Sequence, residues 1–300
     1  MNEKEQIEVV QDGLLVRAPA KINLSLLIAG KRPDGFHEIE TVMAKVNWSD
    51  EILIQRAKRP GIELICKGPY WAPAGKENLI FQAAKLILKS SGTKANLKIT
   101  LTKNIPAGSG LGSGSSDAAA TLIGLNRYLD LDLKRKDLAK LAAKLGSDVP
   151  FFLNGPLAFC KGKGEKVKKL RKVFNFLALI ILPDVSVSTK KAYANYRHNP
   201  AIYYGLSAQI NEYILKNRID LVAKMCANML QTSCFGLAKN LARLKEKIES
   251  LGIRPLRLTG SGSGIFYIIE NRDLKTAGAD ADILKKKLGC TSVIVSNNRW

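Results

Sequence analysis

The chain has 300 residues, 46% of them hydrophobic, and a formal net charge of +21 at pH 7. This length and apolar content are enough for one large or two ordinary folded domains. Because no run of about 18 apolar residues occurs, we expect no membrane-spanning helix, and the acidic, polar start of the chain predicts no secretory signal peptide. The positive charge favours anionic partners, namely nucleic acid, anionic lipid or phosphorylated metabolites, without choosing among them.

The first half of the chain has both strand and helix patterns. Short runs of β-branched and apolar residues, broken by Gly, Pro and Asp, predict strands. Longer segments with apolar residues three and four apart predict helices. The expected strands are 14–28, 41–48, 51–56, 62–67, 96–102, 151–153 and 157–160, and the expected helices are 77–90, 115–128 and 134–145.

The second half repeats this mixture. The expected strands are 176–182, 256–258, 265–269 and 291–295, and the expected helices are 208–216, 220–230, 237–251 and 279–288. This alternation is not that of an all-α or all-β protein, so it predicts an α+β fold in two domains. We divide the chain into residues 1–160 and 161–300, with the seam somewhere in 155–175.

A glycine-rich loop lies between an expected strand and an expected helix. Its residues are Pro106, Ala107, Gly108, Ser109, Gly110, Leu111, Gly112, Ser113, Gly114, Ser115 and Ser116. The glycines allow positive φ and close approach of the backbone to a ligand. The free N–H groups and the positive dipole end of the helix then face an anion. The loop therefore predicts a phosphate site. It is neither a Walker A motif, which needs Gly-Lys-Ser/Thr, nor a complete Rossmann fingerprint.

Two other segments carry isolated charges in apolar surroundings. Lys21 lies inside an expected strand, where a lysine needs a charged partner or ligand unless it points to solvent from a sheet edge. Asp148 lies on an expected turn between a helix end and an apolar strand, where ordinary turn chemistry is the alternative. The residues alone leave both alternatives open.

The five cysteines, Cys66, Cys160, Cys226, Cys234 and Cys290, are scattered and odd in number. Without a C-x-x-C pair they predict neither disulfides nor a zinc site. Reduced thiols of this kind favour a cytoplasmic location. The densest basic cluster, 161–172, is interpreted as a solvated hairpin face rather than as a nucleic-acid site.

The order of motifs resembles the GHMP kinases. The matching segments are PAKINL (19–24), GKRPDGFHEIET (30–41), IPAGSGLGSGSSDAAA (105–120), LGSDVPFF (145–152) and LTGSGSG (258–264). The glycine-rich loop marks the superfamily. The PAKINL and GKRPDGFHE segments, with LGSDVPFF, are similar to the branch that phosphorylates the 2-hydroxyl of 4-diphosphocytidyl-2-C-methyl-D-erythritol in non-mevalonate isoprenoid synthesis.

The resemblance implies a fold and a set of roles. The N-terminal domain would be similar to the second domain of ribosomal protein S5, and the C-terminal domain would be ferredoxin-like. Asp148 would be the general base and Lys21 its cationic neighbour. ATP would bind the glycine-rich loop together with Mg²⁺, for which no cage of protein ligands is expected. The substrate would contact Asn23, Phe36, His37, Thr189, Tyr193, Gly260, Ser261 and Gly262, with the base between aromatic walls.

Three departures from the family pattern stand out. Phe36 replaces a common tyrosine, Asp117 replaces an asparagine and adds a charge near the phosphate loop, and 228–231 lacks two acidic residues. Two other functions remain open. One is a mevalonate or homoserine type of kinase, against which the aromatic–His pair argues. The other is a basic nucleic-acid-binding protein on an S5-like scaffold, against which the lack of a basic aromatic stripe argues. We expect no nucleic-acid or membrane partner, and the sequence gives no oligomeric state.

Overall fold

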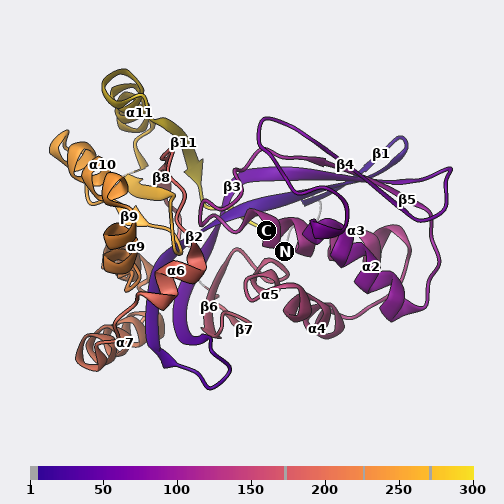
Figure 1. Cartoon of the computed structure of the whole chain (residues 1–300), viewed down its shortest axis with the longest axis horizontal. Helices are drawn as coiled ribbons and strands as arrows, with labels where there is room; N and C mark the ends of the chain where they lie inside the picture. The colour runs from indigo at the N-terminus through magenta and orange to yellow at the C-terminus, as the bar shows by residue number, and fades with distance from the viewer. Residues whose placement is uncertain (1–5, 172–173, 226, 270–271) are drawn as a thin grey trace.

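The molecule consists of two β-sheets with helices packed on them (Figure 1). The computed structural model describes residues 6–171, 174–225, 227–269 and 272–300. Lys172 of the basic cluster and Cys226 therefore lie outside the described residues. The mixed architecture confirms the α+β prediction.

A hairpin of two long strands, β2 (Gly13–Lys31) and β3 (His37–Arg56), crosses the molecule (Figure 1). The sequence predicted a break in β3 at Asp50, but the strand is continuous. Asp50 is fully buried, and its carboxylate accepts hydrogen bonds from the backbone N–H groups of Asn104 and Ile105. It therefore binds a neighbouring segment instead of forming a turn. The register of the hairpin shifts on both sides of the pair Lys21 and Asn23.

The first sheet has the order β1-β2-β3-β5-β4, and β6 and β7 branch from it. β3 makes this branch because its C-terminal part pairs with β5 while its N-terminal part pairs with β6. The remaining strands of this sheet are β1 (Ile7–Val10), β4 (Ile62–Lys67), β5 (Leu97–Thr102), β6 (Leu157–Gly162) and β7 (Lys166–Lys169).

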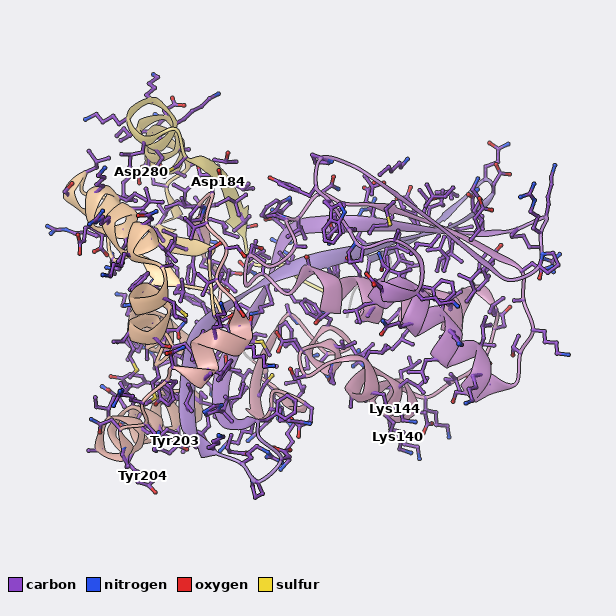
Figure 2. All side chains as sticks on the ribbon, viewed as in Figure 1. Lys140, Lys144, Asp184, Tyr203, Tyr204 and Asp280 are labelled. Carbon is purple, nitrogen blue, oxygen red and sulfur yellow. The ribbon has the colours of Figure 1, made fainter. Side chains whose placement is uncertain are left out.

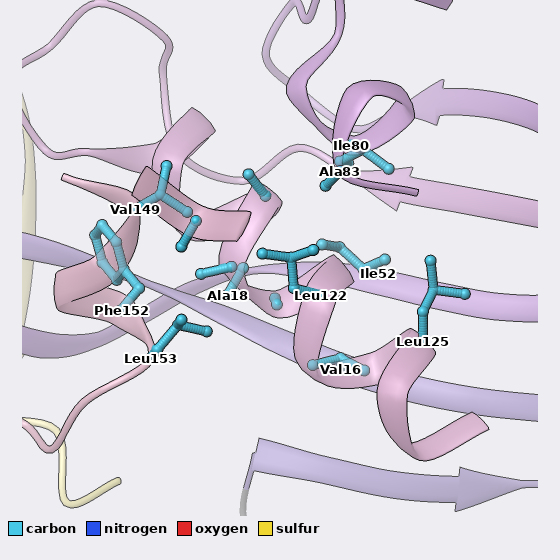
Figure 3. Packing of buried hydrophobic residues seen from close by; sticks show 14 of the residues in the cluster. Val16, Ala18, Ile52, Ile80, Ala83, Leu122, Leu125, Val149, Phe152 and Leu153 are labelled. Carbon is cyan, nitrogen blue, oxygen red and sulfur yellow. The ribbon is translucent and has the colours of Figure 1, made fainter. Parts of the chain in front are cut away.

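The helices of the first half pack on one face of this sheet (Figure 1). They are the short 3-10 helix η1 (Gly75–Glu77), α2 (Leu79–Ser91), α3 (Ser113–Tyr128) and α4 (Arg135–Leu145). Their apolar residues form one core with the sheet, in which Leu122 and Leu125 of α3 lie against Val16 and Ile52 of the hairpin (Figure 3). This core fixes the start of α3, and with it the glycine-rich loop.

Residues 151–153 were predicted as a strand, and this prediction was wrong. Val149–Phe152 instead form a single helical turn, α5. Pro150 favours this conformation because its fixed φ suits the first turn of a helix. A four-residue apolar run buried on all sides does not distinguish strand from helix by its pattern. Val149, Phe152 and Leu153 pack into the first core (Figure 3).

The second sheet is antiparallel with the order β11-β8-β10-β9. Its strands are β8 (Leu177–Leu182), β9 (Arg257–Leu258), β10 (Ile265–Ile269) and β11 (Thr291–Ser296). The helices are α6 (Thr189–Ala194), α7 (Pro200–Leu215), α8 (Ile219–Lys224), α9 (Gln231–Leu237), α10 (Lys239–Ser250) and α11 (Leu274–Leu288). Over the described ranges, no helix is both long and apolar enough to span a bilayer.

Two helix predictions in this half were wrong in extent. The helix expected at 220–230 ends as α8 at Lys224, because Leu26 of β2 exchanges backbone hydrogen bonds with Ala227 and Met229. The helix expected at 208–216 begins eight residues earlier, as α7 at Pro200, where the side chain of Asn199 accepts from Ile202 N–H. The helix expected at 237–251 is confirmed as α10, and the preceding α9 was not predicted.

The second half packs against the far end of the hairpin. Leu26, Ile28 and Ile39 form one apolar cluster with Leu179 of β8 and Leu258 of β9. A further cluster joins the hairpin to β8, α7 and α8. The hairpin therefore contributes to the core of both halves, and the loops of both halves meet beside it.

Candidate active site

A cavity of about 420 Å³ lies between the hairpin, the glycine-rich loop and the loop after β9. Most of the predicted site residues line it: Lys21, Asn23, Ala107, Gly108, Ser109, Gly110, Gly112, Ser113, Gly114, Ser115, Asp148, Thr189, Tyr193, Gly260 and Ser261. Leu111, Ser116 and Gly262 are buried behind the loops, and Pro106 lines a separate hollow. Phe36 and His37 line a neighbouring cavity.

The glycine-rich loop has the backbone that a phosphate site requires. Gly110 and Gly112 have φ values of 77° and 70°, which are unfavourable for other residues. A Cβ on Gly112 would lie 3.0 Å from both the Lys21 side chain and Phe152. Gly112 is also the N-cap of α3 and has no side chain to cap it. The first N–H groups of the helix and its dipole therefore face the cavity.

The loop is held from two sides. The N–H of Lys21 donates to Leu111 O at 2.9 Å, which attaches the loop to β2. From the second half, Gly264 N–H donates to Ser109 O at 3.0 Å and the Thr259 hydroxyl donates to Gly110 O at 3.1 Å. The loop shape therefore depends on contacts between the two halves of the chain.

Lys21 and Asn23 point into the cavity from β2. Alternate residues of a strand share a face, and both side chains are almost fully buried. The ammonium of Lys21 donates to Asn23 Oδ1, and Asn23 Nδ2 donates to Thr41 Oγ1 at 2.8 Å. The hydroxyl of Thr41 in turn donates to Ser25 O at 2.6 Å. This chain of hydrogen bonds fixes the direction of the lysine, so Lys21 is not a solvent-facing edge residue.

Asp148 lies opposite Lys21 as the N-cap residue of α5. Its Oδ2 is 3.9 Å from Lys21 Nζ, and its side chain is 33% exposed, against 4% for Lys21. The carboxylate is therefore open to the cavity while the cation is enclosed. The geometry brings together the two groups that spacing in the sequence could not connect.

Burial and charge shift the pKa values around this pair. Burial lowers the pKa of the Lys21 ammonium, and the Asp148 carboxylate raises it by a smaller amount. Burial also raises the pKa of the Cys160 thiol and of the Tyr193 phenol, and Asp148 adds to both effects. The thiol and the phenol stay protonated near pH 7 and cannot accept a proton. An anionic ligand beside Lys21 would favour its charged form.

An aromatic cavity of about 840 Å³ adjoins the first. Phe36, 56% exposed, lies at its rim. The His37 ring lies 5.1 Å from the ring of Tyr193 and 6.1 Å from that of Tyr196. Burial lowers the pKa of His37, and Lys31 and His198 act in the same direction. A neutral imidazole both donates and accepts a hydrogen bond, which suits the edge of a nucleobase.

Lys163 connects the two cavities. Its side chain lines both, together with Ile39, Ser147, Thr189 and Tyr193. Its Nζ lies 4.4 Å over the centre of the Phe36 ring, which is the geometry of a cation–π contact. A cation is thus present at the passage through which an extended ligand would reach from the aromatic cavity to Lys21.

Asp117 does not place a free charge beside the loop. Its Oδ2 accepts from Lys103 Nζ at 2.7 Å, and Lys103 also pairs with Asp50. Burial raises the pKa of Asp117 to about 8, Lys103 opposes this effect, and Asp50 adds to it. Asp117 is therefore part of a buried cluster with Lys103 and Asp50 and does not present its charge to the loop. Its Oδ1 and the adjacent Ser116 hydroxyl are buried and have no hydrogen-bond partner in the described part of the chain.

The loop after β9 is held by Asn228. Its Nδ2 donates to Leu258 O and to Gly260 O, both at 2.9 Å. Ser261 contacts the Thr189 hydroxyl at 2.7 Å, and its carbonyl accepts from the Cys234 thiol. Asn228 is the first residue of the segment that departs from the family pattern. The departure leaves the residue that makes these hydrogen bonds in place.

No group of three or more His, Cys, Asp or Glu side chains in the described residues is arranged to hold a metal. The cavity beside the loop does offer oxygen atoms from Glu77, Ser113 and Ser115. Oxygen donors are the ligands that Mg²⁺ prefers when phosphates supply the others. These residues fit a magnesium ion carried in with a nucleotide.

Two family models match the chain: the GHMP kinases N terminal domain over residues 78–156 and the GHMP kinases C terminal domain over residues 210–288. The chain belongs to the GHMP kinase family. The first match includes the glycine-rich loop and Asp148, and the second covers α8, α9, α10 and the loop after β9.

Similar proteins agree on a particular member of this family. A 4-diphosphocytidyl-2-C-methyl-D-erythritol kinase of Clostridium botulinum is 35% identical over 85% of this chain and 91% of its own length. One of Geobacillus is 36% identical over 86% and 89%. A crystal structure of 4-(cytidine 5'-diphospho)-2C-methyl-D-erythritol kinase matches 95% of this chain and 100% of its own, with a TM-score of 0.75 and 29% identity. A homoserine kinase of Cytophaga hutchinsonii, at 21% identity and a TM-score of 0.74, shares the fold.

Sequence reasoning missed several residues of these cavities. Lys163 was grouped with a solvated basic cluster, although in the structure it directly follows β6 and its ammonium lies over the Phe36 ring. Tyr196 follows Tyr193 by three residues, a spacing that places both on one side of α6 and its end. Asn228 lines neither cavity and was noted only as part of a departing segment, because its role depends on carbonyl groups 30 and 32 residues away.

Proposed function

We propose that this chain is an ATP-dependent kinase that phosphorylates the 2-hydroxyl of 4-diphosphocytidyl-2-C-methyl-D-erythritol. One observation carries the proposal beyond kinase chemistry in general. The cavity with Lys21, Asp148 and the glycine-rich loop continues past Lys163 into an aromatic cavity that contains a neutral histidine. A cytidylyl group would occupy the aromatic cavity, its diphosphate would pass Lys163, and the methylerythritol hydroxyl would reach Asp148.

The glycine-rich loop would bind the ATP phosphates through the N–H groups at the start of α3. This orients the γ-phosphate toward Asp148 and replaces its water shell by fixed dipoles. Mg²⁺, held by the phosphates and water with Glu77 and Ser113 nearby, would neutralise the phosphate charge. Phosphoryl transfer needs mainly positioning and charge stabilisation, which these groups supply.

Asp148 would accept the proton of the 2-hydroxyl at its exposed carboxylate. The attacking oxygen then forms its bond to the γ-phosphorus as the bond from that phosphorus to the ADP oxygen breaks. Lys21, 3.9 Å from Asp148, would stabilise the negative charge on the attacking oxygen and on the transferred group. Asn23 holds Lys21 in this direction through its own hydrogen bond.

At the aromatic cavity, Phe36 would stack on the cytosine ring once the Lys163 ammonium leaves the ring face. His37 would bind the edge of the base, and Tyr193 would form the second wall. Thr189 would close this cavity from the second half, and Gly260 and Ser261 would contact the substrate in the first cavity. Phe36 keeps the aromatic face that stacking needs, so the lack of a tyrosine hydroxyl is compatible with this role.

Two further predictions remain proposals. The division at 160/161 is one, and the pairing of β7 with β6 favours a boundary shortly after Lys169. A cytoplasmic location is the other, supported by the free thiols of the described cysteines.

Part of the basic excess lies on exposed helix faces, for example Lys140 and Lys144 of α4, which point outward from the molecule (Figure 2).

The test is ADP release, measured by a coupled assay with ATP, Mg²⁺ and each of three acceptors. The acceptors are 4-diphosphocytidyl-2-C-methyl-D-erythritol, mevalonate and homoserine. Turnover with the cytidylyl acceptor alone supports the proposal, and competition by free cytidine nucleotides would locate the base. Turnover with mevalonate or homoserine instead of the cytidylyl acceptor would contradict the proposal. Salt-sensitive RNA binding without stabilisation by ATP would favour a nucleic-acid-binding protein.

A further inference from the structure

Lys45 is completely buried, with 0% exposure, and is among the largest fully buried side chains in the described part of the chain. Its Nζ donates to two backbone carbonyls, Phe152 O at 3.0 Å and Asn154 O at 2.7 Å. The charged groups that act on it most are two cations, Arg135 and Lys169. A buried amine in such surroundings costs free energy, so its presence in a core strand calls for a physical reason.

The position of Lys45 in the hairpin relates it to the reaction site. Lys45 of β3 lies directly opposite Lys21 of β2 in the strand register. Directly opposed residues of antiparallel strands have their side chains on the same face of the sheet. Lys21 extends to Asp148 at the start of α5, whereas Lys45 extends to Phe152 at its end. Two neighbouring lysines thus contact the two ends of one helical turn.

This turn has few hydrogen bonds of its own, chiefly those that Asn154 donates to Pro150 O and Phe151 O. α5 has four residues, so it is shorter than a stable isolated helix. The side chain of Asp148 does not cap it, and Pro150 provides no N–H group. The carbonyl groups at the end of a helix have no partner within the helix. Lys45 supplies donors to two of the carbonyls in this segment from the rigid strand beneath it.

The chemistry of the amine matches these two acceptors. Burial lowers the pKa of Lys45 to about 7, and Arg135 and Lys169 act in the same direction. A neutral amine has two N–H groups, one for each carbonyl, and leaves no buried N–H without a partner. An arginine would be too large and a methionine would leave both carbonyls unpaired.

We propose that Lys45 is a positioning residue of the kinase, which holds α5 by the carbonyls of Phe152 and Asn154 and so fixes the Asp148 carboxylate opposite Lys21. This inference rests on the proposed function, in which Asp148 is the base. Lys45 touches neither ATP nor acceptor in this role. It acts on the rate because a displacement of about 1 Å at a reacting group can lower turnover about 100-fold.

The test compares Lys45→Met with a matched control, Ile54→Val, which changes another buried residue of β3, nine positions further along the strand. For Lys45→Met we expect a fall in kcat of at least tenfold, with the KM values for ATP and acceptor within twofold of wild type. Hydrogen–deuterium exchange of the peptide covering 148–154 should become faster. The control should change neither kcat nor that exchange.

A second variant, Lys45→Gln, retains N–H donors near the carbonyls, and we expect it to lose less kcat than Lys45→Met. Equal losses in both variants, or an unchanged exchange rate at 148–154 in Lys45→Met, would overturn the inference. If wild-type enzyme turns over none of the three acceptors, the proposed function fails by itself. The exchange measurement then still decides whether Lys45 holds α5, because it needs no substrate.

Discussion

Replacing Lys21 by methionine removes the buried cation next to Asp148 while keeping a chain of similar length. At the observed 3.9 Å and an effective dielectric constant of about 20, two unit charges attract each other by about 4 kcal/mol. Because one third of the Asp148 side chain is exposed, solvent screening reduces this to about 2 kcal/mol at that group. Solvent screens the attraction between Lys21 and the transferred phosphoryl group less, because the cavity encloses that group.

The two energies, about 2 and about 4 kcal/mol, set the expected fall in kcat. Each 1.36 kcal/mol corresponds to about a tenfold change, so kcat of Lys21→Met should fall between about 30-fold and 1000-fold. The KM for ATP should change little, since the N–H groups of the loop remain. Burial lowers the pKa of Lys21, which means that its charge is costly in the fold. We therefore expect the free energy of unfolding to stay the same or to rise by about 1 kcal/mol.

The assay is coupled ADP release at saturating ATP, with urea unfolding of the same preparations. Arg17→Met is the matched control, because Arg17 is a cation of the same strand that pairs with Glu8 outside the cavity. Its kcat should stay within twofold of wild type. If Lys21→Met retains more than a third of wild-type kcat, or loses activity only in proportion to lost stability, the electrostatic role assigned to Lys21 is wrong.

Three other predictions concern the base, the aromatic cavity and pH. Asp148→Asn should lower kcat by about 100-fold to 10,000-fold while calorimetry finds ATP affinity within threefold; a rate within tenfold of wild type would remove Asp148 as the base. Phe36→Ala should raise the acceptor KM about tenfold and leave the ATP KM unchanged; an equal rise in both would place Phe36 elsewhere. Burial lowers the pKa of Lys45 from 10.5 to about 7, so the unfolded chain binds more protons between these values. The stability that depends on this group is therefore lost as pH falls from 10.5 toward 7. The difference in urea midpoint between wild type and Lys45→Met should be larger in favour of wild type at pH 9.5 than at pH 7.5. A difference that does not change with pH would contradict this assignment.

The phosphate loop was predictable because its signal is local. The glycines at 108, 110 and 112, between a strand and a helix, carry the conformational requirement in the sequence itself, and the structure has positive φ at all three. Lys21 was identifiable as unusual by its apolar neighbours. That it faces Asp148, 127 positions away, followed from family resemblance and from the fold, since no spacing along the chain encodes that contact.

The segments that were mispredicted have environments that only packing defines. The apolar run at 149–152 has no period, so its helical turn depends on Pro150 and on the carbonyl contacts of Lys45. Lys45 itself lies in an ordinary strand sequence and gave no signal. Asp50 has the composition of a turn residue and instead serves as a buried acceptor inside β3.

The hairpin of β2 and β3 also determines how the chain can be divided. Leu26 and Ile28 of β2 are buried against Leu179 and Leu258 of the second half. A fragment that begins after β7 would lack the hairpin residues that cover its own core. The other fragment, which contains the hairpin, would expose Leu26 and Ile28 to solvent. Cutting the connection between β7 and β8 would thus give two complementary chains, each incomplete alone. Because Lys21 lies on one piece and the loop that holds Gly110 on the other, activity in such a split enzyme would report their reassembly.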